Sequence, residues 1–299
     1  MTEGNTHNQD AFARAFWGDV MAGEEDLREE RFPLVEVQTA IAWEVIGDVL
    51  RPDMRVLDAG GGTGRYSLPL AAQGHRVLHL DFSPAMLNRA RKAARARGLR
   101  NIQFAKGDVR RLKGIKDRAH DLTLCLDAPI SYAWPHHEQA LAEVCRVTDD
   151  VLVLMVSSRY GVAPFMLEYD LSGEFTPGGG MDAQNPFRTT EAILAHGVEQ
   201  HDPETRALLE REGKLTPPDY AFTIPELAEL VRNNGFEVVR FGGPGALARN
   251  LERAQLQRIT ADETLFRRFI QLSLRFDFDP HNAGMGAVNI LMVAKRLKD

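Results

Sequence analysis

The sequence is most informative at Val56-Leu-Asp-Ala-Gly-Gly-Gly-Thr-Gly-Arg65, where a short apolar run ends in a carboxylate and passes into a glycine-rich turn. This order is typical of a buried strand, a tight turn and the start of a helix, because glycine lacks Cβ and lets the backbone approach a ligand closely. The helix would point its free N–H groups toward the same place. In open α/β sheets, ligands bind beyond the carboxyl ends of the strands. The stretch therefore predicts a ligand-binding crevice.

The spacing of the glycines distinguishes two kinds of nucleotide site. The dinucleotide fingerprint is Gly-x-Gly-x-x-Gly, and Arg65 occupies the position of its third glycine. The pattern present is Gly60-x-Gly62-x-Gly64, which follows Asp58 directly. A second apolar run, 76–80, also ends in a carboxylate, that of Asp81. A carboxylate at this place can accept hydrogen bonds from ribose hydroxyls, whereas the alternative is a plain connection between a strand and a helix.

These two stretches resemble the first two motifs of the class I S-adenosylmethionine (SAM) dependent methyltransferases. Two later stretches, 106–109 and 121–127, resemble the acidic turn beside the adenine and the strand that ends under the donor. The resemblance covers residues 33–156 and resumes at 235–239 and 288–294. It implies an α/β fold: a Rossmann-like, doubly wound, seven-stranded and mostly parallel sheet, with an N-terminal helical cap and a lid insertion after the fifth strand. It also implies SAM as the cofactor.

The resemblance implies a set of SAM contacts. Asp58 would bind the methionine amino group and Asp81 the ribose. Asp108 would accept the adenine amino proton, or alternatively cap the turn that follows it. Gln38 lies where related enzymes can place an arginine for the methionine carboxylate, and it offers a hydrogen bond without the charge. The full predicted set is Gln38, Asp58, Gly60, Gly61, Gly62, Asp81, Phe82, Met86, Asp108, Val109 and Leu126. No metal site and no particular catalytic residue are predicted.

The composition suits one large α/β domain, since 44% of the 299 residues are hydrophobic. We expect a cap at 1–52, a SAM-binding core at 53–156, a lid at 157–222 and a completion of the sheet at 223–299. The two cysteines, Cys125 and Cys145, lack the spacing of metal ligands and are interpreted as reduced core thiols. No run approaches a membrane span, and the first residues do not resemble a signal peptide. The sequence therefore predicts a cytoplasmic protein without a membrane partner.

The flanking segments are expected to shape the pocket. Residues 10–22 form one helix whose apolar face (Phe12, Phe16, Trp17 and Val20) either roofs the donor pocket or simply packs on the domain. The acidic run 24–30 reads as a solvated connection, and a helix follows from Pro33 to about Leu50. Thr148-Asp149-Asp150 is expected to form the turn before the fifth strand.

The acceptor side is expected after the fourth and fifth strands. The loop 127–135 and the segment 157–220 are rich in aromatic residues, and the segment carries Phe175 and a hinge at Pro177-Gly-Gly-Gly180. Long irregular segments in compact domains are usually lids or flexible loops. If the acceptor needs a general base, four side chains are available: Tyr132, His136, His137 and Tyr160. The two histidines could equally be surface residues at the start of a helix.

The net charge of −6 is distributed unevenly. Residues 85–118 contain twelve basic and two acidic side chains, a net charge of +10, so the rest of the chain carries −16. Such a segment is either a set of solvated helix faces or a surface for nucleic acid or another polyanion. The basic residues are Arg89, Arg91, Lys92, Arg95, Arg97, Arg100, Lys106, Arg110, Arg111, Lys113, Lys116 and Arg118.

The leading functional hypothesis is methyl transfer from SAM to an oxygen, nitrogen or carbon nucleophile. The aromatic insertion and the overall acidity favour a small-molecule acceptor. The alternative acceptor is a carboxylated wobble uridine in tRNA, because 40–43, 215–220 and the ending after Asp279-Pro280 loosely resemble the bacterial tRNA carboxymethoxyuridine methyltransferases. Two hypotheses from other classes are an NAD-dependent oxidoreductase, which Arg65 opposes, and a non-catalytic SAM-binding regulator.

Overall fold

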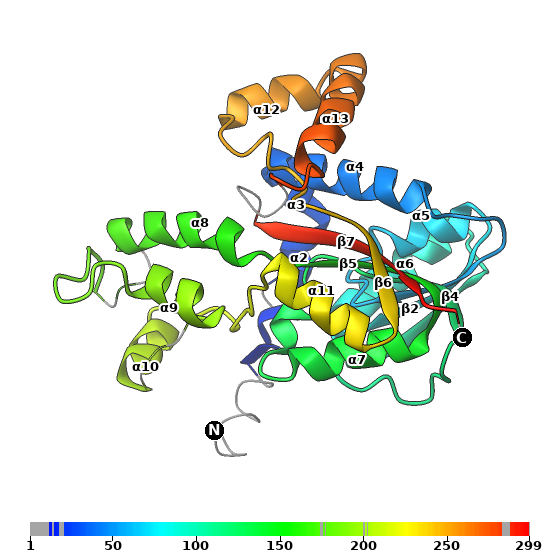
Figure 1. The fold of residues 1–299 in the computed structure, drawn as a ribbon, viewed down its shortest axis with the longest axis horizontal. Coiled ribbons are helices and arrows are strands. Elements are labelled where there is room, and N and C mark those ends of the chain that lie inside the picture. The colour runs from blue at the N-terminus through cyan, green and yellow to red at the C-terminus, as the bar shows by residue number, and fades with distance from the viewer. Residues whose placement is uncertain are drawn as a thin grey trace.

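The computed structural model describes residues 12–13, 15–17, 21–173, 176, 178–199, 201, 203–282 and 288–298, and it contains one seven-stranded sheet with helices on both faces (Figure 1). The order of the strands across the sheet is β3-β2-β1-β4-β5-β7-β6. The strands are β1 Arg55–Ala59, β2 Arg76–Asp81, β3 Ile102–Lys106, β4 His120–Cys125, β5 Thr148–Ser157, β6 Phe236–Gly242 and β7 Asn289–Arg296.

The pairing of the strands confirms the predicted sheet. Strands β1 to β5 run parallel, and β7 is antiparallel to both β5 and β6. Leu57 on β1 pairs with Leu78 on one side and with Thr123 on the other. Because parallel strands end at the same edge, the residues that follow β1, β2 and β4 meet there. The strand order also reverses beside β1, which is where a crevice opens in such sheets.

Helices cover both faces of the sheet. The α4, α5 and α6 side carries one apolar core, which includes Val45, Leu68 and Ala94, and the α7 and α11 side carries another, which includes Leu141 and Leu227. The helices are α2 Met21–Glu24, η2 Glu25–Leu27, α3 Arg28–Arg31, α4 Pro33–Gly47, α5 Ser67–Ala72, α6 Pro84–Ala96, η3 Ser131–Ala133, α7 His137–Val147, α8 Arg159–Ser172, α9 Arg188–His196, α10 Pro203–Arg211, α11 Ile224–Asn233, α12 Arg253–Thr260 and α13 Glu263–Asp277.

Local signals explain where the main helices begin. Ser83 caps α6 by accepting a hydrogen bond from the Met86 N–H, and proline follows it at the first helical position. Thr223 and Glu226 form a capping box at the start of α11. The pair α12 and α13 adds a layer on α4, with Ile41 in its core. None of the described helices has both the length and the apolar character needed to cross a membrane.

The prediction of a turn before the fifth strand is wrong. Thr148, Asp149 and Asp150 belong to β5, which follows the last residue of α7 without a connection. The Thr148 hydroxyl donates to the Val144 carbonyl at 2.6 Å, and the Arg296 Nε donates to the Thr148 carbonyl at 2.9 Å. These bonds satisfy the end of the helix, so no separate turn is needed.

The segment after β5 is more regular than predicted. It forms three helices, α8, α9 and α10, which project from one side of the sheet and are called the helical arm below (Figure 1). The Asp170 carboxylate joins two of them by accepting hydrogen bonds from the N–H groups of Thr189 and Thr190. Phe175 and Pro177 of the expected hinge lie outside the described residues. The division of the chain at 52, 156 and 222 stays a prediction.

Candidate functional site

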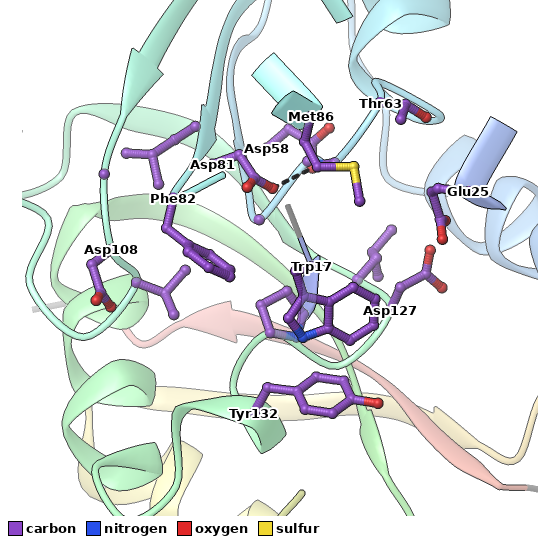
Figure 2. Close-up of a pocket in the computed structure, with 18 of the residues that line it drawn as sticks. Trp17, Glu25, Asp58, Thr63, Asp81, Phe82, Met86, Asp108, Asp127 and Tyr132 are labelled. Carbon is purple, nitrogen blue, oxygen red and sulfur yellow. Dashed lines mark hydrogen bonds between the residues drawn. The ribbon is translucent and has the colours of Figure 1, made fainter. Parts of the chain in front are cut away.

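A pocket opens at the carboxyl ends of β1, β2 and β4, at the edge where the sequence predicts one (Figure 2). Further lining side chains come from the N-terminal segment and from the loop after β4. Ten of the eleven predicted SAM contacts line this pocket: Asp58, Gly60, Gly61, Gly62, Asp81, Phe82, Met86, Asp108, Val109 and Leu126.

Asp81 ends β2 with both carboxylate oxygens held by backbone N–H groups. One oxygen accepts from Gly62 at 2.9 Å and the other from Ser83 at 2.8 Å. Burial raises the pKa of Asp81, and these N–H groups oppose that rise. A carboxylate oxygen can accept more than one hydrogen bond, so both oxygens retain capacity toward the pocket. The two hydroxyls of a ribose match this arrangement.

The glycine turn lies in close contact with its surroundings. Gly60 has a φ of +83°, and a Cβ atom there would lie 2.5 Å from the Pro129 ring. A Cβ atom on Gly61 would lie 2.5 Å from Nδ1 of His79 and 2.7 Å from Oδ2 of Asp58. All three distances are below any ordinary contact distance. The turn therefore requires glycine at these two positions because of close packing, beyond conformational freedom alone.

Asp58 is a buried carboxyl group that faces this turn, with an exposed fraction of 1%. Its Oδ2 has no hydrogen-bond partner in the described part of the chain. Burial raises its pKa to about 7, although Ser67 donates hydrogen bonds to it. Nδ1 of His79 lies 3.9 Å from Oδ2, but burial lowers the pKa of His79 to about 4, so this ring is neutral at pH 7. A cationic amino group of a ligand would balance the Asp58 charge.

The predicted adenine end combines apolar walls with one acid. Phe82, Met86 and Val109 line it, as the resemblance implies. The Asp108 carboxylate accepts from the Arg110 backbone N–H at 2.9 Å and pairs with the Arg110 guanidinium at 2.6 Å. Both readings of Asp108 are thus compatible with its position: it closes the turn that follows, and it lines the pocket. Its contact with the adenine amino group stays a prediction.

A charged cluster that the sequence did not predict lies at the opposite end of the pocket and is formed by Glu25, Arg28, Arg65 and Asp127. Arg65 donates to Asp127 at 3.0 Å and to Glu25 at 2.8 Å, while Arg28 lies 3.3 Å from Glu25. The Glu25 side chain is only 11% exposed. The expectation that the run 24–30 is a solvated connection is therefore wrong, because Arg65 pairs with two of its acids, Glu25 and Glu29.

One sequence signal for this charged cluster was available. Arg65 breaks the dinucleotide pattern, and it is also a long cation directly after a ligand-binding turn, within reach of the ligand. Asp127 directly follows the fourth strand, and its φ of +60° is unusual for a residue with a side chain. Backbone strain of this kind is concentrated at functional sites.

Trp17 and Tyr132 close the pocket beside the charged cluster. Their rings meet edge to face with centroids 4.9 Å apart, and Figure 2 shows the Trp17 ring beside Asp127 with Tyr132 below it. The N-terminal helical segment therefore contributes to the roof of the pocket, the first of its two expected roles, although Val20 lies outside the described residues. Burial raises the pKa of Tyr132, so its phenol keeps its proton and is a hydrogen-bond donor rather than a base.

The other expected bases lie elsewhere. His136 lines a separate groove, and Tyr160, on the helical arm, is 54% exposed. His137 is buried and stacks on Tyr220 with a centroid distance of 3.9 Å, so the surface reading of this residue is wrong. No described residue of the helical arm lines the pocket. Within the described residues, no group of His, Cys, Asp and Glu side chains is arranged to hold a metal ion.

Gln38 is the predicted contact that the structure places elsewhere. It is absent from the pocket lining. Its side-chain amide donates to the Pro244 carbonyl at 3.2 Å, and its Cγ lies 3.2 Å from the position of a Cβ atom on Gly245. Gln38 thus joins α4 to the loop after β6. The expected contact of Gln38 with the methionine carboxylate is corrected, because Gln38 is bonded to Pro244, whereas the arginines that line the pocket are Arg28, Arg65 and Arg110.

Comparisons with known proteins agree with this geometry. Residues 56–150 match the family model described as a methyltransferase domain. The tRNA 5-carboxymethoxyuridine methyltransferase of Escherichia coli K12 is 40% identical over 74 residues, which is 23% of this chain and 28% of that protein. The chloroplastic magnesium protoporphyrin IX methyltransferase of Arabidopsis thaliana is 31% identical over 142 residues, or 46% of this chain and 41% of that protein. The matched regions thus span less than half the length of both relatives.

A solved structure extends the likeness to the whole fold. The 1,6-didemethyltoxoflavin-N1-methyltransferase of Burkholderia thailandensis, crystallised with S-adenosylhomocysteine, is 18% identical and has a TM-score of 0.52 over 98% of this chain and 90% of that one. At this identity the likeness concerns the fold. The match to the family model identifies residues 56–150 as a methyltransferase domain, and the strand order and the pocket at the ends of β1 and β2 agree with that description.

Proposed function

We propose that this chain binds SAM in the pocket at the ends of β1, β2 and β4 and transfers its methyl group to a nucleophile. The observation that carries the proposal is the pair of carboxyl groups on one edge: Asp81, held by two N–H groups, and Asp58, buried with an unpartnered oxygen. These two groups are suited to a ribose and to a cationic amino group. SAM carries both of these groups.

The remaining polar groups suit the methionine end of the same ligand. Arg28 and Arg65 line the pocket beside Glu25 and Asp127, and guanidinium groups bind carboxylates in a planar, paired geometry. They would hold the methionine carboxylate. The charge of the cluster itself is balanced, so that binding one carboxylate would need Arg28 or Arg65 to share its hydrogen bonds between the ligand and Glu25.

The chain then has to position the acceptor and to exclude water. When bound, SAM supplies a methyl group already activated by its sulfonium, so little acid–base chemistry is required. The side chains of Trp17 and Tyr132 close the pocket beside the charged cluster, and the Tyr132 phenol can donate a hydrogen bond to an acceptor there. Holding two reactants in line at about 3–3.5 Å accounts for much of the acceleration in such reactions.

For the acceptor, we propose a small molecule as the first candidate. Two observations support it: the pocket is roofed by the edge-to-face pair Trp17 and Tyr132, and two of the proteins compared above are named for small substrates, a porphyrin and a toxoflavin precursor. The second candidate is a nucleoside in RNA. The exposed basic segment 85–118 and the partial likeness to a tRNA methyltransferase favour it.

Calorimetric titration with S-adenosylhomocysteine (SAH) tests the donor site. We expect the wild type to bind SAH, and Asp81→Ala to weaken binding about 100-fold, since two hydrogen bonds to a charged group are each worth roughly 1.5 kcal/mol or more. Asp150→Ala is the matched control, because Asp150 pairs with Arg51 on the surface. Equal affinity in wild type and Asp81→Ala, or binding of NADH instead of SAH, would refute the proposal.

Incubation with methyl-labelled SAM separates the acceptors. Label that enters the small-molecule fraction of a cell extract supports the first candidate, and label that enters total tRNA or rRNA supports the second. Tight SAH binding without any transfer would instead favour a non-catalytic SAM-binding regulator. The same protein preparation serves both assays, so a failed transfer is not confused with a misfolded sample.

A further inference from the structure

The basic segment 85–118 comprises most of helix α6, the edge strand β3 and the chain that leads to β4, and its exposed cations are called the basic face below. Helix α6 packs beside β3, where Arg91 lies over the Phe104 ring with 5.7 Å between the guanidinium carbon and the ring centroid. The chain after β3 then continues this face toward α7. Seven of its cations are exposed and make no ion pair within the described part of the chain: Lys92, Arg95, Arg97, Arg100, Lys106, Lys113 and Lys116.

A groove of about 530 Å³ runs through this face. Its apolar lining, called the floor below, includes the half-buried Leu78, Ala105 and Ile115, and its polar lining includes Lys106, Arg111, Lys113, His136 and Gln139. The groove shares Leu80, Gly107, Asp108 and Arg110 with the donor pocket, so the two hollows are neighbours at the predicted adenine end. Proteins that bind single-stranded nucleic acid combine a cationic groove for the phosphates with rings on which bases stack, and here the cations line the groove together with the His136 ring and the apolar floor.

We propose that this groove and the basic face around it bind single-stranded RNA, with a base on the apolar floor and phosphates on Lys106, Arg111 and Lys113. A duplex fits the arrangement less well, because its bases are stacked inside and cannot reach the floor. The proposal deepens the RNA candidate above and rests on it for its biological meaning. Binding itself is measured without any methyl donor.

Two other readings of the basic face are weaker. Cations on an edge strand can serve to prevent sheet-to-sheet aggregation, but Arg111, Lys113 and Lys116 lie beyond the end of β3. A membrane surface would require apolar side chains that insert beside the cations. Among the described residues, none of the exposed large hydrophobic side chains lies between Phe32 and Tyr160 in the chain, which includes the whole basic face.

The expected salt dependence of RNA affinity follows from counterion release. If about four of the cations contact phosphates of single-stranded RNA, the slope of log K against log salt concentration is about −3. Affinity should then fall about 60-fold between 50 and 200 mM KCl. The triple variant Arg111→Glu, Lys113→Glu, Lys116→Glu should reduce the slope by about 2 and the affinity at 50 mM by at least tenfold.

Fluorescence anisotropy with a labelled, mixed-sequence 20-nucleotide RNA measures both quantities. The matched control is the triple variant Arg253→Glu, Arg258→Glu, Arg268→Glu, which changes the charge equally on exposed positions of α12 and α13. SAH titration of all three proteins shows whether the donor site is intact, so a failure of RNA binding is distinct from a failure of the proposed function. The expected result is loss of RNA binding in the first variant alone, with SAH affinity unchanged.

Three outcomes would overturn the proposal. The first is no RNA binding by the wild type at 50 mM KCl. The second is an equal loss in both triple variants, which would mean a response to net charge rather than to this face. The third is equal or tighter binding of an RNA duplex of the same length, or of vesicles rich in anionic lipid, because neither presents an unstacked base to the apolar floor.

Discussion

The buried carboxyl group of Asp58 is expected to make donor binding depend on pH. Burial, together with repulsion from Asp81 and Asp127, raises its pKa to about 7 in the unliganded protein. A ligand with a cationic α-amino group binds the ionised form. Because a raised pKa leaves the group protonated at low pH, affinity should fall as pH decreases below 7. The neutral ring of His79 does not change over this range, since its pKa is about 4.

The size of the effect follows from the ionised fraction of Asp58. With a pKa of about 7, this fraction is about 0.9 at pH 8 and about 0.1 at pH 6. If the protonated form binds negligibly, SAH affinity should be about tenfold weaker at pH 6 than at pH 8, equivalent to about 1.4 kcal/mol. Asp58 is 1% exposed, so salt should screen this effect little. Binding at pH 7 should also release about half a proton.

Calorimetry in two buffers with different ionisation heats measures affinity and proton release together. Titrations of SAH at pH 6, 7 and 8 should show the tenfold change in the wild type. Asp58→Asn keeps the size of the side chain but cannot ionise, so we expect weaker binding with no pH dependence and no proton release. Equal affinity of the wild type at pH 6 and pH 8, with no proton released at pH 7, would refute the assignment of Asp58 to the amino group.

The same shift has a second consequence, for the stability of the unliganded protein. A carboxyl group whose pKa is higher in the folded state than in the unfolded state binds more protons when folded. Stability therefore falls as pH rises from about 4 to about 7 and stays low above that. The cost of ionising Asp58 at pH 8 is of the order of 4 kcal/mol. SAH should recover part of it, so the rise in Tm on SAH binding should be larger at pH 8 than at pH 6.

Three further substitutions test the geometry of the pocket and its support. Arg65→Ala removes the partner of Glu25 and Asp127, so it should lower the free energy of unfolding in urea by about 1–3 kcal/mol and weaken SAH binding. The control Arg51→Ala breaks an exposed pair with Asp150 and should lower the free energy of unfolding by less than about 1 kcal/mol. Gly61→Ala should lower the free energy of unfolding by about 1–3 kcal/mol and weaken SAH binding, because the new Cβ would lie against His79. Gly62→Ala should lower stability only through its positive φ, because nothing lies within 4 Å of the new Cβ. Asp277→Asn should destabilise the protein by about 1–3 kcal/mol, because the buried Asp277 carboxylate accepts from the N–H groups of Gly245 and Leu247; unchanged unfolding would contradict this.

The donor end of the site was predictable because its signals are local. Asp58 and Asp81 each end a strand and each precede a turn, and the sheet brings the ends of adjacent strands together. The apolar runs, together with the family resemblance, were equally sufficient to predict a seven-stranded and mostly parallel sheet. Strand β5 shows the limit of such local signals. By residue type, Thr148, Asp149 and Asp150 predict a turn, but in the structure they belong to the strand. There the distant Arg296 donates to the Thr148 carbonyl, and the Thr148 hydroxyl donates to the Val144 carbonyl.

Gln38 shows a different limit. The predicted helix that begins at Pro33 is present, and Gln38 lies on it as predicted. The face of the helix on which Gln38 lies depends on what packs against it, and here the loop at Pro244 and Gly245 occupies that face. No pattern within α4 indicates a partner more than 200 residues away. A resemblance that transfers a position along the chain does not transfer the direction of a side chain.

The other end of the pocket could not be predicted because no single segment forms it. Glu25 and Arg65 come from parts of the chain 40 residues apart, and each has an ordinary solvated alternative in the sequence. An acid in a charged run is buried only if a cation reaches it, and that cation is supplied by the tertiary structure. The same reasoning applies to Trp17 and Tyr132, which meet only after the N-terminal segment folds over the sheet. The proposed donor contacts lie at strand ends that the sequence reveals, whereas the groups proposed to face the acceptor are brought together by these long-range contacts, so experiments on the acceptor should start from Trp17, Tyr132 and the charged cluster.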